Sequence, residues 1–485
     1  MVKKYRKNSN MLLLLILLLL SITLGYATLS SNINITGVSK IKNVTWNIYW
    51  NNIQVTDGSV TNVTTPATIK PGKLEVEFDI SFSTPGDFYE FTVDAVNDGT
   101  IDAMLDNFNL TINNNPSTTL PDYLEYKVTY VDDSTMEINH ILYAEEKETY
   151  KVRVSYKKDI EAEQLPQEAQ TFNFCILTNY IQVSKESLPT KAIFLDGNNF
   201  NTKIKKLAGD ENPAINTDNE SIIAIRRSTI KPNISSMNRD NIISTANSGR
   251  IYAWFEDGTI YFYSEYSEVY INPDASGMFQ NLLYTEVIEL NKMNSSLMEN
   301  MSCMFLYTSS EIDSVDLIGI ENLNVSNVTN MEATFADFGM SISNFSLDLS
   351  SWDVSKVQNM SMTFTGTAID SSTFNLDISN WDTRNVTDMI GMFLRTAEDA
   401  VWLNPITIDI YNSKIDNMFN DTFSVKAILN LYNNPISYGG IFSNYAASRN
   451  DGFVQINYKE TVTEIDNIVA KKLPGCNITK GNIIP

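Results

Sequence analysis

Four aspartates stand at equivalent points of a recurring pattern and are the side chains best placed to do chemistry. Each lies between two apolar residues, as in Leu347-Asp348-Leu349, and the set comprises Asp316, Asp348, Asp377 and Asp409. An apolar-Asp-apolar run is typical of a strand that points its acid to solvent. If such strands stack about 4.8 Å apart, neighbouring carboxylates repel by roughly 1 kcal/mol in water. A bound cation, a raised pKa or a cationic partner would compensate for this repulsion.

Three interpretations of this acidic row stay open. Calcium would suit carboxylate ligands in an exported protein, but the spacing matches no EF-hand or nonapeptide calcium motif, so we predict no metal and no cofactor. The acids could instead lie on a solvated face or hold turns by hydrogen bonding. The functional alternative is a partner-binding face, for which charge reversal of Asp348 and Asp377 should abolish binding without lowering the melting temperature.

Two Trp-Asp pairs follow these acids, at Trp352-Asp353 and Trp381-Asp382. Indole rings could stack on a sugar ring or a proline of a partner, or they could pack between neighbouring repeats. We therefore treat Trp352 and Trp381 as candidate partner-binding residues beside the four acids.

Catalysis has little support in the composition. The chain holds one histidine, His140, and three cysteines, so Ser-His-Asp or Cys-His chemistry would have to use that single histidine. His140 follows Asn139 in a polar turn and is expected at the surface. The sequence has no P-loop, Gly-rich dinucleotide loop, HExxH or G-x-S-x-G element. We predict that the protein is not an enzyme.

The charge balance excludes other classes of protein. Acids outnumber bases by 58 to 35, which gives a net charge of −23. A nucleic-acid binder needs a basic surface to displace counterions from phosphate, and docking on anionic lipid needs one too. We expect no nucleic-acid partner.

The N-terminus has the features of an export signal. Residues 1–10 carry four bases and no acid, and residues 11–20 read MLLLLILLLL. This is the basic and apolar pattern of a secretory signal, and cleavage after Ala27 is predicted from the small residues around it. The alternative is an uncleaved anchor helix over residues 1–29 that just spans the membrane. In both cases the remainder is exported, either secreted or held at the cell surface.

The next two regions have different patterns. Residues 30–185 alternate apolar and polar side chains over 73–80, 88–96 and 150–156, with Gly and Pro turns between them. This predicts an antiparallel β-sandwich. Residues 186–265 are polar at first and are predicted to be a linker that ends in a capping hairpin. Its strands flank Asp257-Gly258, and its aromatic residues are expected to cover the end of the following array.

Residues 266–435 contain an internal repeat of about 29 residues. Its copies include SSLMENMSCMF (295–305), VSNVTNMEATF (325–335), VSKVQNMSMTF (354–364) and TRNVTDMIGMF (383–393), with a degenerate copy at 412–423. The closing phenylalanines of the pattern stand at Phe279, Phe305, Phe335, Phe364, Phe393 and Phe423. Val328, Met331 and Phe335 fall on one helical face, which predicts one strand and one short helix in each repeat. One repeat cannot bury this face alone, so the copies should stack as a solenoid, closed by a cap at 436–485.

A polar residue precedes the recurring methionine of each copy. The residues are Asn300, Asn330, Asn359, Asp388 and Asn417. A polar side chain at a fixed turn position can bond free backbone groups. We interpret the row as a structural ladder.

The repeat resembles that of the BspA-like leucine-rich-repeat surface proteins. The best copy, LDISNWDTRNVTDMIGMF (376–393), shows the apolar-Asp-apolar run, the Trp-Asp pair and the closing Met-Phe in register. The resemblance implies a bacterial cell-surface protein used for adhesion or partner binding. Together these patterns predict a mixed, β-rich fold: an N-terminal signal or anchor helix, an antiparallel β-sandwich, and an α/β leucine-rich-repeat solenoid with a β-hairpin cap.

The expected function is surface binding or adhesion, with the repeats presented to an extracellular protein or glycan. The uncleaved helix, if kept, would add contact with the membrane. The alternative is a structural protein of the envelope or biofilm matrix that self-associates through edge strands of the sandwich.

Overall fold

The described part of the chain is β-rich. The computed structural model describes residues 44–485 apart from 61–64, 72–73, 114, 117–119, 162–163, 165, 167, 169–170, 399 and 450, and residues 46–485 form one compact unit. The expected signal or anchor at 1–29, with its cleavage candidate Ala27, lies outside this range. Within the described range no helix has the length and apolar character needed to cross a membrane.

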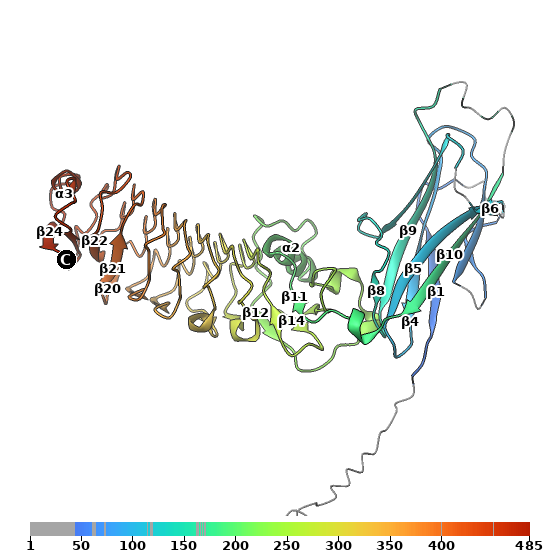
Figure 1. Cartoon of the computed structure of the whole chain (residues 1–485), viewed down its shortest axis with the longest axis horizontal. Helices are drawn as coiled ribbons and strands as arrows, with labels where there is room; N and C mark the ends of the chain where they lie inside the picture. The colour runs from blue at the N-terminus through green and yellow to red at the C-terminus, as the bar shows by residue number, and fades with distance from the viewer. Residues whose placement is uncertain are drawn as a thin grey trace, which may run out of the picture. The chain divides into compact units, whose positions relative to one another are not determined.

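Two antiparallel sheets occupy the N-terminal part of the described chain (Figure 1). The first has the order β1-β4-β9-β7, with strands β1 (Ile48–Val55), β4 (Phe88–Asn97), β9 (Lys147–Tyr156) and β7 (Leu124–Tyr130). The second has the order β2-β3-β10-β5-β6, with β8 paired to β5; its strands are β2 (Thr68–Ile69), β3 (Glu75–Ile80), β10 (Phe172–Gln182), β5 (Ala103–Ile112), β6 (Asn115–Pro116) and β8 (Ile141–Leu142). Side chains of β9 alternate strictly between buried and half-buried, as one face of a sheet packed on a core requires. The core between the sheets is aromatic, with Phe78 stacked on Phe174.

The segment expected to be a polar linker is folded. It contains β11 (Ala192–Ile193), α2 (Gly197–Leu207), β12 (Ala224–Arg227) and the 3₁₀ turns η2 (Lys185–Ser187), η3 (Ile234–Ser236) and η4 (Arg239–Asn241). Asp196 caps α2 by accepting from Asn199 N, and Phe200 and Ile204 are fully buried. The composition of this segment is polar because few apolar residues suffice to bury one face of a short helix. Its composition alone therefore predicted a linker.

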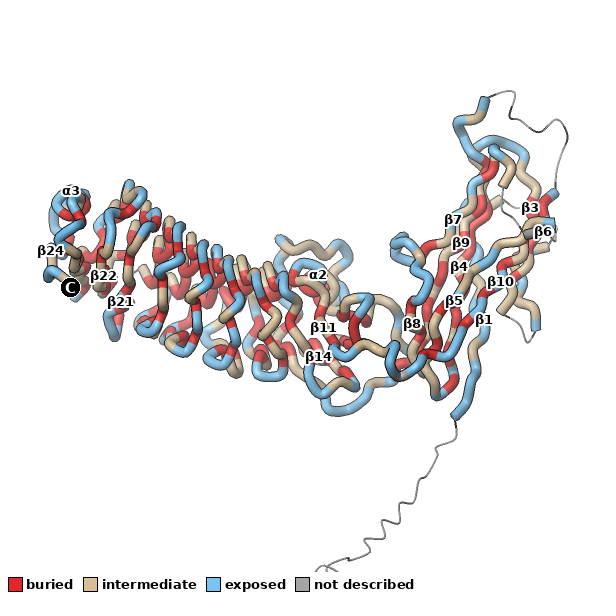
Figure 2. Tube along the Cα trace, viewed as in Figure 1, coloured by how far each residue is buried: buried red, intermediate tan, exposed pale blue. Residues whose placement is uncertain are grey.

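The strands in the rest of the chain pair in parallel, except for the antiparallel pair β13 and β14. They form three sheets of order β13-β14-β12-β16-β17, β18-β19-β20 and β21-β22-β23-β24, and β11 pairs with β15. The elements are the hairpin β13 (Tyr252–Glu256) and β14 (Thr259–Tyr263), then β15 (Val269–Tyr270), β16 (Val287–Ile288), η5 (Leu290–Lys292), β17 (Asp316–Leu317), η6 (Ile320–Asn322), β18 (Asn344–Asp348), β19 (Thr373–Asp377), β20 (Val401–Trp402), β21 (Ile406–Ile410), β22 (Lys426–Leu431), β23 (Phe453–Tyr458), α3 (Ile465–Val469) and β24 (Ile478–Ile483). Buried residues line the inside of these stacked repeats, and exposed residues lie at their bends (Figure 2).

The predicted fold class is wrong for the repeats, which are β-rich and are not an α/β leucine-rich-repeat solenoid. The predicted signal or anchor helix lies outside the described residues. Over 331–338, where a helix was expected, every second N–H group donates to the next repeat, as Met331 N does to Asn359 O (2.9 Å). From Thr334 onward the intervening N–H groups donate three residues back. An α-helix would send each N–H group four residues back, so this segment is a chain of overlapping turns.

Left-handed residues set the spacing of these turns. Ala333 and Asp337, four residues apart, have φ of 51° and 50°. The position of Ala333 is taken in other repeats by Cys303, Met362, Gly391 and Asn417, all with positive φ. This period of four returns apolar side chains to one side almost as a helix of 3.6 residues per turn does, which is why the sequence resembled a helix.

The phenylalanine stack corrects the predicted register at the last repeat. Phe335 and Phe364 stack at 5.6 Å and 1°, and the stack continues from Phe393 to Phe419 at 5.7 Å and 7°. Phe419 is fully buried. Phe423, which the sequence pattern placed in this stack, is half-buried and lies under the Arg449 guanidinium instead.

The polar ladder shows the same shift. Parallel bridges link Asn300, Asn330, Asn359, Asp388 and Lys414 in turn. Asn417 is therefore not its fifth member, because this repeat is shorter than those before it. On the ladder, Asn330 Oδ1 accepts from Glu332 N at 3.1 Å, a turn that a short polar side chain stabilises.

The middle segment also binds the sandwich through charged side chains. Arg250 donates to Glu146 Oε1 at 3.0 Å, and its Nη2 lies 3.0 Å from His140 Nε2. Arg239 pairs with Asp132 at 3.0 Å. His140 is buried, at 8% exposure, so the expectation of a surface histidine is wrong.

The register correction can be tested with two alanine variants. Phe419→Ala should lower the free energy of unfolding by about 3–5 kcal/mol, since it empties a fully buried ring site. Phe423→Ala should cost less, about 1 kcal/mol, because that ring is only half-buried. Urea denaturation followed by circular dichroism measures both. A larger loss in Phe423→Ala would show that the sequence-based register is the right one.

Candidate binding pocket

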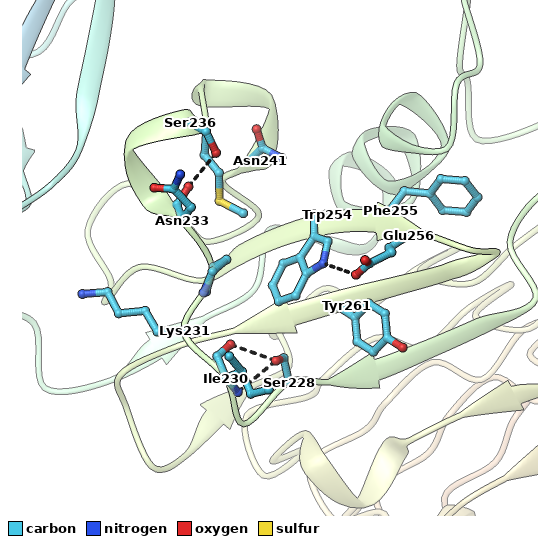
Figure 3. A pocket seen from close by; sticks show the side chains of 12 residues that line it. Ser228, Ile230, Lys231, Asn233, Ser236, Asn241, Trp254, Phe255, Glu256 and Tyr261 are labelled. Carbon is cyan, nitrogen blue, oxygen red and sulfur yellow. Dashed lines mark hydrogen bonds between the residues drawn. The ribbon is translucent and has the colours of Figure 1, made fainter.

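A pocket of about 710 Å³ opens beside the aromatic hairpin (Figure 3). Its floor is the outer face of β13 and β14, and its wall is the connection from β12 to η4. The lining residues are Ser228, Ile230, Lys231, Pro232, Asn233, Ser236, Met237, Asn241, Trp254, Phe255, Glu256 and Tyr261.

Alternation along the hairpin places two rings in this pocket. Ala253, Ile260 and Phe262 are fully buried in the core of the repeat array. Successive side chains of a strand point to opposite faces, so Trp254 and Tyr261 lie on the other side. The two are cross-strand partners, with ring centroids 5.5 Å apart and planes 25° from parallel.

The pocket wall covers only part of this outer face. Ile234, Ile242 and Met237 pack on the neighbouring ring pair, Tyr252 and Tyr263, to form a small separate core. Tyr252 is buried in this small core and Tyr263 is half-buried against it. Trp254 and Tyr261 take no part in this core and are half-buried. Ile230 stands at the rim with 77% exposure.

Polar groups surround the two rings. Trp254 Nε1 donates to Glu256 Oε2 at 3.3 Å, and Ser236 Oγ donates to the carbonyl of Asn233 at 2.8 Å. Lys231 Nζ lies 3.0 Å from carboxylate oxygens of Glu145 and Glu265. Burial lowers the pKa of Lys231, but its hydrogen bonds to the two acids outweigh this and raise the pKa overall.

The pocket has the features of a binding site. An apolar platform with a few polar groups at its edge fixes the orientation of a ligand. Among the lining residues no serine, lysine or acid is paired with a histidine or cysteine. Over the described range no cluster of three His, Cys, Asp or Glu side chains could hold a metal ion.

The structure brings together only two of the four predicted acids. Asp348 and Asp377 are register partners in β18 and β19. Asp316 pairs instead with Val287. Asp409 belongs to another sheet, where its Oδ1 accepts from Asn430 Nδ2 at 2.8 Å. The continuous acidic row is therefore interrupted.

The two neighbouring acids hold turns at the ends of their strands. Asp348 Oδ1 accepts from Ser350 N at 3.0 Å and from Ser350 Oγ at 2.7 Å. Asp377 Oδ1 accepts from Ser379 N at 3.0 Å. Hydrogen bonds from the Ser350 hydroxyl and backbone keep the pKa of Asp348 below its ordinary value. The charged form is therefore stabilised locally.

The two candidate tryptophans lie inside the array. Trp352 and Trp381 are 2% and 9% exposed and stack on each other at 6.4 Å. Their indole N–H groups donate to the carbonyls of Ile320 and Leu349, both at 2.9 Å. Neither ring is open to a partner in this arrangement, so we leave both out of the proposed binding surface.

Trp254 and Tyr261 were missed as candidate binding residues. The sequence showed them in a hairpin, and their aromatic character was interpreted as a cap on the array. Strand alternation does separate their face from that of Ile260 and Phe262. Only the structure shows that the connecting segment covers half of this face.

A family model matches the repeats. Residues 273–401 and 309–434 match the family model described as "Mycoplasma protein of unknown function, DUF285". This match hints at a surface protein, and it does not confirm the resemblance to BspA-like leucine-rich-repeat proteins. No curated protein and no solved structure matches the chain.

The turn-holding role of the acids predicts a difference between two double variants. Asp348→Asn with Asp377→Asn keeps the side-chain acceptor and removes the charge, so the melting temperature should stay near that of the unmodified protein. The matching double alanine variant loses both acceptors and should be less stable by about 1 kcal/mol per site. Thermal unfolding separates the two, and equal losses in both would show that charge is what stabilises these positions.

Proposed function

We propose that this chain is an exported binding protein of the cell surface that holds an extracellular partner at the Trp254–Tyr261 pocket. The observation that supports the proposal is the half-buried ring pair left uncovered beside a packed hairpin. A Trp or Tyr ring supplies a large rigid contact area, and such residues dominate binding energies at interfaces. A single such site binds weakly, and many copies on one cell would add avidity.

The family match and the resemblance to BspA-like surface proteins both agree with a place at the cell surface. The proposal no longer includes a leucine-rich-repeat face or the buried tryptophans. It keeps the expectation that the role is recognition without catalysis, since the pocket offers orientation and contact area but no paired nucleophile and base.

The test is binding of purified residues 30–485 to a panel of extracellular matrix proteins and glycans. Trp254→Ala and Tyr261→Ala should each weaken the binding by roughly tenfold or more, as for a central aromatic contact. Tyr445→Ala is the matched control, since Tyr445 is 54% exposed and does not line the pocket.

Unchanged melting temperatures in the three variants would make the comparison one of binding alone. Saturable binding that all three variants retain would place the partner elsewhere on the chain. Absence of any binding across the panel would count against the proposed function as a whole.

Self-association is the second candidate function, and one strand favours it. β1 is the edge of its sheet, has eight residues and no proline, and exposes Tyr49 and Val55. A long apolar edge strand can pair with another chain. Against this, the register shift between Asn51 and Gln54 is a bulge that twists the edge, and bulges of this kind oppose such pairing.

An edge-pairing role predicts that the particle size grows with concentration. Tyr49→Lys with Val55→Lys should abolish that growth, because charges on an edge strand block pairing. Leu177→Lys is the control, since this exposed residue lies on β10 between two other strands. Light scattering across a concentration series decides the matter, and a constant monomer mass in the unmodified protein would remove this candidate.

A further inference from the structure

We propose that the pocket binds one pyranose ring of a neutral glycan, laid on the Trp254–Tyr261 pair. This inference rests on the proposed function and adds the chemical class of the ligand. A pyranose has an apolar C–H face and a rim of hydroxyl groups, which is the pattern that a flat ring bordered by polar side chains complements.

The geometry of the ring pair favours a flat ligand over a cationic one. A quaternary ammonium group is held best inside a cage of rings that face it from several sides. Here the two planes are only 25° from parallel at 5.5 Å separation. No group fits between two rings already in stacking contact, so the pair offers a flat ligand an outward ring face.

The polar groups at the rim fit hydroxyl groups. Glu256 is exposed, and its carboxylate has more lone pairs than the bond from Trp254 Nε1 uses. Asn233 and Ser236 border the opposite side and carry an amide and a hydroxyl group (Figure 3). Together these groups offer both donors and acceptors to a sugar, which presents both as well.

The charges around the pocket disfavour an acidic ligand. Lys231 is the only cationic residue among the lining residues, and it is paired with Glu145 and Glu265. Two acids around one base leave this corner negative, and Glu256 adds a further negative charge. The chain as a whole carries −23. A sialylated or sulfated sugar would meet repulsion there, so the expected ligand is uncharged.

The volume agrees with this class of ligand. About 710 Å³ falls within the range of roughly 300–1,000 Å³ that small-molecule pockets have. Ile230 and Glu256 are exposed lining residues, so the remainder of a longer glycan can leave the pocket toward solvent.

The test uses residues 30–485 with soluble methyl pyranosides and short oligosaccharides, followed by saturation-transfer NMR and calorimetry. At least one neutral pyranoside should bind saturably and transfer saturation through its ring C–H protons. Trp254→Ala should remove the binding, and Trp254→Phe should retain part of it, because a smaller flat ring remains. Glu256→Gln should weaken it severalfold at most, and Tyr445→Ala should not change it.

The rival ligands are included as probes. Choline bound more tightly than every pyranoside, or sialyllactose bound more tightly than its neutral counterpart, would overturn the inference. So would pyranoside binding that Trp254→Ala leaves intact. Trp254-dependent capture of a matrix protein with no sugar binding would also overturn it while leaving the proposed function standing, so the two failures are distinguishable.

Discussion

The repeat array depends on one constraint: the backbone N–H groups of its turn segments must find acceptors without a helix. Every second group donates to the next repeat, as Met331 N does to Asn359 O, and so fixes the distance between repeats. The price is a left-handed residue at every fourth position, which costs a non-glycine residue such as Met362 roughly 1–2 kcal/mol. The stacked phenylalanines and buried threonine hydroxyl groups compensate for it. Thr367 Oγ1, for example, donates to Phe335 O in the preceding repeat at 2.5 Å.

This constraint also determines which side chains are left for function. Apolar residues on the inner face pack against the equivalent residues of the neighbouring repeat. Trp352 and Trp381 do the same, since they stack on each other. The polar residues at the bends hold turns, as Asp348 and Asn330 do. Side chains of these two kinds in the middle of the array therefore already have a structural role, either in packing or in a turn. The hairpin before the array differs, because only one of its faces serves the stack.

Features that repeat along the chain could be predicted from the sequence. The backbone conformation within a repeat and the register of the last repeat could not. Strand alternation is visible in β3 and β9, and the polar ladder was recognisable through Asp388. The helix was a false inference, since apolar residues spaced by three and four suit turns of four residues almost equally. Asn417 and Phe423 were misplaced because a shortened repeat still offers residues of the expected type, and only packing shows that Phe419 fills the ring position.

The candidate pocket could not be predicted from the sequence for a related reason. The role of Trp254, as a cap or as a binding surface, depends on how far the segment around η3 extends across the hairpin. This segment has no periodic pattern, so its course could not be predicted from the sequence. Its apolar residues Ile234 and Ile242 bury Tyr252 and pack against the half-buried Tyr263, and the residues that follow return to the core of the array. Burying an aromatic pair fully would stabilise a purely structural cap. The segment packs against one ring pair and not against its neighbour, and the proposed ligand would occupy the face that is left.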